Sequence, residues 1–445
     1  MKSVAQLTPN IRLSQAITSF VSHLQTKEQA KSHLEQAHAH LSKILNLKPS
    51  HILLTHGARA GLYALLQNIK KNNKSANQVV LSAYTCRVLI NPIQKSELDP
   101  VFTDLDRQNL TTDLNDLQSK LSSKTLAVVI QNTFGTYDDW KVIAELVKSK
   151  APKAKLICDN AHFLPNKAEF AEQAKYFDYA IFSFGTNKIL SASMLGALIS
   201  FQRPLAANIS SSLDNLPTKQ AHLLLFKNWY FYISLKLYSL CKIGKCMLFA
   251  VSKLNLVPKV VSDSEKKLIH TNVAYYKASS LLGFSLLSAL KYYQTEITHR
   301  VLIKSIYQCN LKKSLQYDKW FRKAPIFFPI QVSNPRKLYK KLLKKGFQTN
   351  LDWTDSMLVP ASQTLPPDYQ ESNYPSSKYV SKHTLCLPLN KTVKPSDAVK
   401  IVELINQYAK LNAGQNNKRL QSFSKVFNSA RSTSLCTNSR VWGIS

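Results

Sequence analysis

The chain has 445 residues, of which 44% are hydrophobic, enough apolar material for a large core and for two domains. Its 59 Lys and Arg residues outnumber 26 Asp and Glu residues, and the net charge of +33 favours anionic partners such as nucleic acid, an acidic membrane or phosphorylated substrates. The 7 Cys residues form no Cys-x-x-Cys pair and the His residues lack metal-ligand spacing, so neither a disulfide framework nor a metal site is expected. The scattered thiols, and an N-terminus without an apolar signal region, predict a cytoplasmic protein.

The first half of the chain changes from a helical to an alternating pattern. Residues 1–50 carry apolar residues at helical spacing and are expected to form an N-terminal helical segment. Across residues 51–220, short apolar runs alternate with helical stretches, which predicts a large α/β domain with a mainly parallel sheet. The expected strands are residues 52–55, 79–84, 100–103, 127–131, 155–158 and 179–184.

A glycine turn follows the first of these strands. Gly57 precedes an expected helix, so the backbone N–H groups around Ala58, Arg59 and Ala60 are expected to form an anion site at the helix N-terminus. An ordinary helix start has the same pattern and stays open as the alternative.

Two later strands end at residues with complementary chemistry. Asp159 ends the run at 155–158, and Lys188 follows the run at 179–184 after a break at Gly185. Parallel strands deliver their carboxyl ends to one edge of a sheet, so the acid and the lysine are expected to lie close together. Pyridoxal phosphate needs such a pair, a lysine that binds it covalently and a carboxylate that keeps its ring nitrogen protonated. Ser183 would add a hydroxyl for a phosphate oxygen, whereas a turn-forming Asp and a solvated Lys are the simpler alternative.

Residues 221–262 form an apolar and basic insert, expected to be helical. No acidic residue occurs between Asp214 and Asp263, and lysines interrupt the apolar run too often to leave the about 20 uncharged residues of a spanning helix. A surface element that contacts anionic membranes through 221–259 is one interpretation, with Leu223, Phe226, Trp229, Phe231 and Phe249 entering the boundary. An insert that packs on the body or on a second subunit is the other.

The last part of the chain is predicted to hold a smaller domain. Residues 263–320 have a helical pattern, and residues 321–412 alternate again, with strands at 326–332 and 384–389 and helices at 335–345 and 395–409. Residues 413–445 are rich in Ser and Asn and lack acidic residues, which predicts a basic disordered tail.

The order of the motifs is more specific than any one of them. Asp-x-x-His at 159–162 precedes Ser-Phe-Gly-x-x-Lys at 183–188; Gly57 to Tyr63, 83–86 and 100–106 lie upstream, and Asn272, Tyr374-Pro375 and 385–389 downstream. This order resembles the DegT/DnrJ/StrS group of fold type I, pyridoxal-phosphate-dependent sugar aminotransferases over roughly residues 1–412.

The resemblance implies roles for individual residues. Lys188 would hold the cofactor and move the proton, Asp159 would face the ring nitrogen, and His162 would contact the ring or its 3-oxygen. Ser183, Arg59 and the backbone from Gly57 to Ala60 would bind the phosphate. Asn272 would reach the cofactor of a neighbouring subunit, which implies a homodimer.

Four positions depart from the family pattern. Arg59 stands where Thr is usual, and Cys86 stands where an aromatic residue stacks on the ring, so His162 is the best candidate to replace that contact. Asn132 occupies a place that often carries His, and Ala274 one that carries Arg.

These observations are consistent with three functions. The first is an aminotransferase that moves an amino group from a glutamate-like amino acid to a keto-sugar nucleotide in surface-glycan or secondary-metabolite synthesis; Lys188 disfavours the dehydratase branch, which carries His there. The second is a non-catalytic or regulatory descendant that binds the cofactor. The third, a nucleic-acid binder, rests on charge alone and has no recognition motif.

Overall fold

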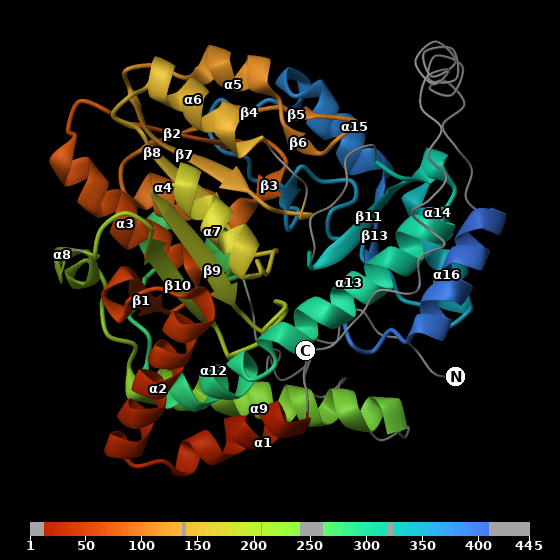
Figure 1. Cartoon of the computed structure of the whole chain (residues 1–445), viewed down its shortest axis with the longest axis horizontal. Helices are drawn as coiled ribbons and strands as arrows, with labels where there is room; N and C mark the ends of the chain where they lie inside the picture. The colour runs from red at the N-terminus through yellow and green to blue at the C-terminus, as the bar shows by residue number, and fades with distance from the viewer. Residues whose placement is uncertain (1–12, 136–138, 206, 241–260, 318–323, 409–445) are drawn as a thin grey trace.

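A seven-stranded sheet forms the centre of the protein, for which a computed structural model describes residues 13–135, 139–205, 207–240, 261–317 and 324–408 (Figure 1). The strand order is β1-β10-β9-β8-β7-β2-β4. The strands are β1 (Ile52–Thr55), β2 (Gln78–Ser82), β4 (Asp99–Thr103), β7 (Thr125–Gln131), β8 (Lys155–Asp159), β9 (Tyr179–Phe184) and β10 (Leu195–Ser200). Neighbours from β9 to β4 are parallel, whereas β10 runs antiparallel to both β9 and β1. The predicted mainly parallel α/β fold is confirmed, with one reversed strand.

Both faces of the sheet are buried, as expected for parallel strands whose residues are apolar on both sides. Val79 and Leu81 of β2 face one apolar cluster, and Val80 between them faces the other. The first face is covered by α3 (Ala58–Asn72) and α4 (Ile90–Lys95). The second is covered by α2 (Lys27–Leu45), α5 (Leu114–Lys120), α6 (Trp140–Lys150) and α7 (Lys167–Tyr176).

A helical layer closes the lower end of the molecule in Figure 1. It contains α1 (Leu13–Val21), the 3-10 turn η1 (Ser22–Leu24), α9 (Thr218–Leu240) and α12 (Gly283–Leu290), which pack on one another and on α2. At the crossing of α12 and α2, a Cβ on Gly283 would lie 2.4 Å from the backbone nitrogen of Leu34, so only glycine permits this approach. The first half of the insert is therefore a helix that packs on the body and starts at Thr218, before residue 221. Residues 241–260 and the predicted tail at 413–445 lie outside the described residues.

The C-terminal part lies at the right in Figure 1 and is joined to the layer by α13 (Tyr293–Asn310). Its strands β11 (Phe327–Gln331) and β13 (Thr384–Pro388) form an antiparallel pair, where the sequence indicated strands at 326–332 and 384–389. Its helices are α14 (Pro335–Lys344), α15 (Pro375–His383) and α16 (Pro395–Tyr408). The short elements α8 (Ala207–Ser211), α11 (Asp263–Lys266), β5 (Leu105–Asp106) and β6 (Thr111–Thr112) complete the fold.

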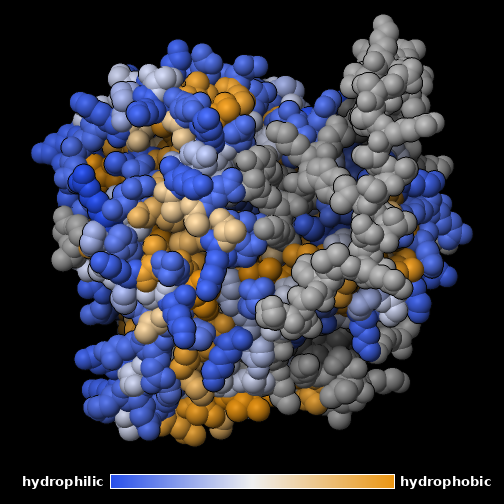
Figure 2. Space-filling model, viewed as in Figure 1, coloured by the Kyte–Doolittle hydropathy of each residue, from blue (hydrophilic) through white to orange (hydrophobic). Residues whose placement is uncertain are grey.

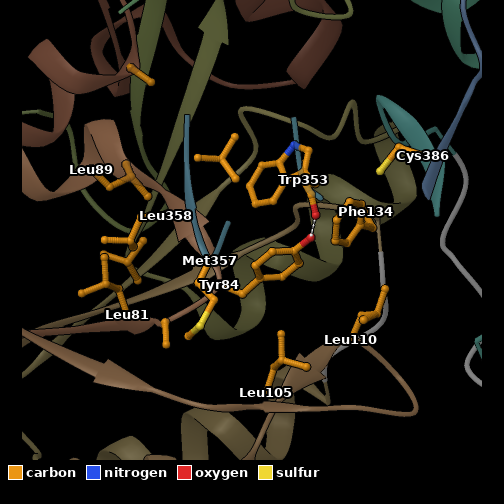
Figure 3. Packing of buried hydrophobic residues seen from close by; sticks show 14 of the residues in the cluster. Leu81, Tyr84, Leu89, Leu105, Leu110, Phe134, Trp353, Met357, Leu358 and Cys386 are labelled. Carbon is orange, nitrogen blue, oxygen red and sulfur yellow. Dashed lines mark hydrogen bonds between the residues drawn. The ribbon is translucent and has the colours of Figure 1, made fainter. Parts of the chain in front are cut away.

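Side chains at the carboxyl edge of the sheet bind the C-terminal part. The hydroxyl of Tyr84 donates a hydrogen bond to the carbonyl of Trp353, and the two rings meet edge to face with Phe134 beside them (Figure 3). Strand β3 (Thr85–Cys86) also pairs in parallel with β12 (Leu358–Val359). Both contacts fix the backbone around residues 353–359 against the end of β2.

A buried carboxylate makes a second junction. Asp104, which follows β4, accepts hydrogen bonds from the backbone N–H groups of Ser376 and Ser377 at 2.9 and 2.8 Å and from the Ser377 hydroxyl at 2.5 Å. It thereby caps the N-terminus of α15 from another part of the chain, where a negative charge also suits the helix dipole. The C-terminal part is thus held over one edge of the sheet.

Candidate active site

A cavity of about 230 Å³ lies where the carboxyl ends of the strands meet the C-terminal part. Eight of the residues that the sequence singled out line it: Gly57, Ala58, Arg59, Cys86, Asp159, His162, Ser183 and Lys188. Ala60 is buried inside the first turn of α3, and Asn272 lies elsewhere on the surface. The structure therefore brings together residues from four separate segments, while their chemical roles stay predictions.

The acid and the lysine come from adjacent parallel strands. Asp159 is the last residue of β8 and accepts a hydrogen bond from the Ala161 N–H at 2.8 Å. Lys188 follows β9 through a tight turn in which its N–H donates to the Gly185 carbonyl at 2.9 Å. Burial lowers the pKa of Lys188 from its ordinary value, and the nearby Cys86 and Asp159 offset this only in part. Burial also raises the pKa of Asp159. The hydrogen bond from the Ala161 N–H and the charge of Lys188 lower this pKa and offset part of the rise.

His162 forms another wall of the cavity. Burial and the neighbouring Lys188 hold its pKa well below the ordinary value, so the ring is neutral at physiological pH. Its carbonyl accepts the N–H of Ile326 at 2.8 Å, and its ring meets Trp353 edge to face at 5.4 Å. The ring is thereby fixed by the C-terminal part.

The glycine turn at the start of α3 has the geometry expected of an anion site at a helix N-terminus. Gly57, with a φ of 85°, is the N-cap residue of α3. Glycine has no side chain that could cap the first N–H groups of this 15-residue helix, which can therefore face an anion. Across the sheet, Thr55 pairs with Gly196, and Gly196 pairs with Ser183. This register sets the Ser183 hydroxyl at the same end of the sheet as the turn. We define the phosphate cradle as Gly57, Ala58, Arg59 and Ser183.

Gly196 makes the cradle sterically possible. A Cβ at this position would lie 2.5 Å from both the Ala58 nitrogen and the Gly57 carbonyl carbon, and 2.7 Å from the Phe182 oxygen. All three atoms are backbone, so a side chain here would have to displace the turn or the neighbouring strand.

Arg59 in the cradle is paired within the chain. Its guanidinium forms an ion pair with the carboxylate of Glu265 in α11, and both side chains are largely buried. Glu265 also closes a capping box with Ser262, which gives this short helix a defined start. The sequence did not indicate this partner.

The other three departures from the family pattern, Cys86, Asn132 and Ala274, lie in different environments. Cys86 borders the cavity as a thiol, and burial raises its pKa. The Asn132 amide is buried and donates to the Asn160 side chain at 2.7 Å, beside Asp159 in sequence. Ala274 lies with Asn272 in a shallow depression away from the cavity.

Sequence reasoning missed the wall that the C-terminal part provides. Phe327, Asp352, Trp353, Val359 and Pro360 all line the cavity, as do Val261, Gln131 and Thr133. Gln131 ends a predicted strand and Thr133 follows it, so that signal could have found both. The others are brought in by contacts between distant segments, such as the bond from Tyr84 to Trp353, which local spacing does not reveal.

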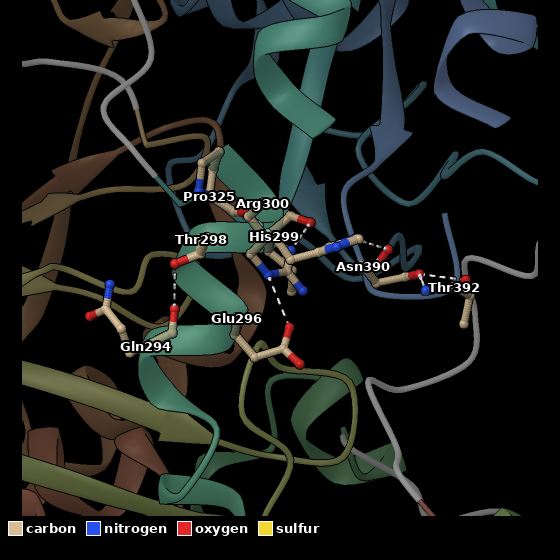
Figure 4. Close-up of polar contacts among 9 residues, drawn as sticks. Gln294, Glu296, Thr298, His299, Arg300, Pro325, Asn390 and Thr392 are labelled. Carbon is tan, nitrogen blue, oxygen red and sulfur yellow. Dashed lines mark hydrogen bonds and ion pairs between the residues drawn. The ribbon is translucent and has the colours of Figure 1, made fainter. Parts of the chain in front are cut away.

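A buried arginine supports this wall from behind. In Figure 4, Arg300 extends from α13 toward Pro325. Its guanidinium donates to the carbonyls of Pro325 and Ile326 at 3.1 and 3.0 Å, with Glu296 3.8 Å away as its counter-charge. Ile326 donates its N–H to the His162 carbonyl, and the next residue, Phe327, lines the cavity. By holding Ile326, Arg300 therefore fixes the positions of both His162 and Phe327.

The fold is that of the fold type I pyridoxal-phosphate enzymes. It matches NtdA from Bacillus subtilis, solved with bound PMP (TM-score 0.62, 15% identity, 92% of this chain and 84% of that one). It also matches DesI, solved in the presence of its TDP-sugar product (TM-score 0.62, 16%, 96% and 96%), and the sugar aminotransferase CalS13 from Micromonospora echinospora (TM-score 0.54, 17%, 84% and 92%).

Sequence comparisons agree with the fold. Residues 28–222 match the model of the DegT/DnrJ/EryC1/StrS aminotransferase family. The chain is 25% identical over 129 residues to GDP-perosamine synthase from Escherichia coli O157:H7 and 28% identical over 102 residues to GDP-4-keto-6-deoxy-D-mannose 3-dehydratase from Yersinia pseudotuberculosis. These matches span 35% and 26% of the relatives' lengths.

We predict that Gly196→Ala destroys the cradle while leaving most of the sheet intact. The added Cβ must push the Gly57 turn aside, at a cost of about 1–3 kcal/mol in stability. Affinity for inorganic phosphate and pyridoxal phosphate should fall at least tenfold by titration calorimetry. Gly61→Ala is the matched control, because its nearest neighbour is a side-chain atom at 3.1 Å. Wild-type affinity in the Gly196 variant would show that the anion binds elsewhere.

Proposed function

We propose that this protein is a pyridoxal-phosphate-dependent aminotransferase that transfers an amino group from a glutamate-like amino acid to a keto-sugar nucleotide. The observation that carries the proposal is the meeting of Asp159 and Lys188 in one cavity beside the phosphate cradle. The family match of residues 28–222 and the fold support it. A keto-sugar nucleotide is suggested by the relative named GDP-perosamine synthase and by the TDP-sugar product present with DesI.

The residues present fit this cofactor. A helix N-terminus, a hydroxyl and an arginine suit a phosphate, and a buried carboxylate with a raised pKa gains its charge when a cationic ring nitrogen lies against it. When bound, pyridoxal phosphate supplies an electron sink for the pair that remains after a C–H bond beside nitrogen is broken. Asp159 would hold the proton on its ring nitrogen.

The chain's own groups would carry the proton steps. The lowered pKa of Lys188 increases the fraction of neutral amine, the form that bonds to the aldehyde carbon and that accepts a proton as a general base. Neutral His162 would contact the ring without adding a charge, and the apolar side chains of Trp353 and Phe327 would exclude water.

A non-catalytic descendant is the second candidate. Cys86 offers no aromatic face to the cofactor ring, and Arg59 is already engaged by Glu265. Such a protein would bind the cofactor and give its absorbance band, but would not transfer an amino group from glutamate. One of the relatives is named a dehydratase; a lysine at position 188 favours amino transfer over that reaction.

We predict that Lys188→Ala removes the visible absorbance band of the protein-bound cofactor and lowers kcat at least about a hundredfold, because proton transfer loses its positioned base. Borohydride reduction of the wild type should attach the cofactor to a peptide that contains Lys188. Lys155→Ala is the control, since Lys155 opens β8 and pairs with Asp178 at 3.1 Å. Labelling of another lysine would end the assignment.

We further propose a homodimer in which Asn272 serves the partner's site. Asn272 is exposed and lies in a depression separate from its own chain's cavity, as a residue that serves a second copy must.

The expected assembly has a complementation test. Lys188→Ala and Asn272→Ala chains should each be impaired alone, but a mixed dimer has one site with both residues intact and should recover activity. Light scattering at the assay concentration should give the mass of two chains. An active monomer, or mixtures that never recover activity, would contradict the shared site.

The helical layer carries an exposed apolar face. It consists of Ile17, Phe20, Leu24, Leu223 and Phe226, whose side chains are 54%, 48%, 72%, 49% and 40% exposed. Phe20 of α1 meets Trp229 of α9 at 5.5 Å, so the two helices present one surface, seen as orange atoms at the lower edge of Figure 2. Trp229 and Phe231, expected to enter a membrane, are instead half-buried, and Phe249 lies outside the described residues. Within the described chain, the helices are too short or too polar to cross a bilayer.

We propose that this apolar face rests on the anionic inner surface of the membrane in a cytoplasmic protein. Lys27 and Lys219 are exposed near its ends, and the sequence from 215 to 262 contains no acidic residue. Each lysine near an anionic leaflet contributes about 1 kcal/mol, and apolar side chains add burial in the boundary region.

Vesicle sedimentation checks this surface. The intact protein should bind vesicles rich in phosphatidylglycerol, bind less in high salt, and ignore neutral phosphatidylcholine. Leu24→Ser with Phe226→Ser should abolish binding, whereas Leu302→Ser with Leu343→Ser, which are also exposed but lie in α13 and α14, should not. If the first pair dissociates a dimer instead, the face is a subunit interface and the membrane proposal is wrong.

A further inference from the structure

The phosphate cradle holds an internal anion. The carboxylate Oε1 of Glu265 is the ion-pair partner of the Arg59 guanidinium, and the two side chains are only 7% and 14% exposed. Arg59 lines the cavity, and so does Val261, four residues before Glu265. A negative charge of the chain itself is therefore fixed beside the place where the cradle would receive a phosphate.

Glu265 is held there independently of Arg59. Its second oxygen, Oε2, accepts the Ser262 N–H at 2.8 Å, and its own N–H donates to the Ser262 hydroxyl at 3.2 Å. The Asn91 side chain donates to the Glu265 carbonyl at 3.0 Å, and Arg87 donates to the Lys266 carbonyl at 3.2 Å. The carboxylate is thus positioned by its own helix, whose backbone is held by Arg87 and Asn91.

The pair changes what the cradle offers to an anion. A buried arginine without a counter-charge strongly favours an incoming phosphate, because the phosphate compensates its lost hydration. An arginine already neutralised by a carboxylate gains much less, and the carboxylate repels the phosphate at short range. Arg59 therefore contributes less to phosphate binding than an arginine in its place would contribute alone.

We propose that Glu265 competes with the phosphate of the bound cofactor for Arg59 and so lowers the affinity of the cradle for phosphate. This rests on the proposed function for the identity of the phosphate-bearing ligand. The role is one of setting affinity: Glu265 acts through Arg59 and touches no reacting atom. A site tuned in this way releases its phosphate-bearing ligand more readily than the unpaired arginine would.

The test is Glu265→Gln in the full-length protein, because glutamine keeps the capping box and removes only the charge. Equilibrium dialysis should show pyridoxal 5′-phosphate bound at least tenfold more tightly than in the wild type. Pyridoxal, which has no phosphate, should bind equally to both. Glu97→Gln is the matched control, since Glu97 pairs with Lys70 at 2.8 Å on the surface and should change neither affinity.

A double-mutant cycle locates the effect at Arg59. In an Arg59→Gln background, Glu265→Gln should no longer tighten the binding of pyridoxal 5′-phosphate. Weaker binding of this ligand in the single Glu265 variant would overturn the proposal, because Glu265 would then orient Arg59 for the phosphate. Equal changes for pyridoxal and pyridoxal 5′-phosphate would overturn it as well, because the residue would then be purely structural.

Inorganic phosphate separates this inference from the proposed function. Titration calorimetry with phosphate alone should show the same tightening in Glu265→Gln. If phosphate binding tightens but neither protein binds pyridoxal 5′-phosphate, the proposed cofactor is wrong and the competition at Arg59 stands. If pyridoxal 5′-phosphate binds to both proteins with the same affinity, the competition is refuted and the cofactor stands.

Discussion

The close contact between the Gly57–Ala58 backbone and Gly196 is the constraint on which the site depends. It exists because β10 runs against its neighbours and sets Gly196 between Thr55 and Ser183. One reversed strand thereby joins the turn at the N-terminus of α3 to the hydroxyl at the end of β9. Lys188 lies in the loop that connects β9 to β10. Asp159 ends β8, the next strand of the sheet. The groups proposed to bind the anion and to move the proton therefore share a single edge.

Burial has one common effect on the groups inside the cavity. It raises the pKa of Asp159 and lowers those of Lys188 and His162, so all three are shifted toward their uncharged forms. The binding of a charged ligand would favour the charged forms of these groups again. The ion pair between Arg59 and Glu265 differs, because each charge is compensated within the chain.

Much of this arrangement could be predicted from the sequence, for a physical reason. Asp159 and Ser183 lie at the carboxyl ends of buried strands and Lys188 follows one. Because parallel strands end at one edge of a sheet, the local pattern was enough to predict that these residues lie close together. Apolar periodicity carries no strand direction, so the reversal of β10 could not be read. Glu265 shows locally only a capping box, and its pairing with an arginine 206 residues earlier depends on tertiary packing. Trp353 reached the cavity for the same reason, through a bond from Tyr84.

The position of β1 at the edge of the sheet has a consequence for how the protein is made. In the described part of the chain, β10 is the one strand of the sheet beside β1, and Ile52 opposes Ile199, so the first strand of the sheet gains its neighbour after about a third of the chain has been synthesised in between. Closing so long a loop is slow, and β1 must wait for it. On the ribosome, the Gly57 turn therefore has no surface to rest on until residues 195–200 have emerged. The nascent chain acquires its phosphate cradle late, in one step with the edge of the sheet.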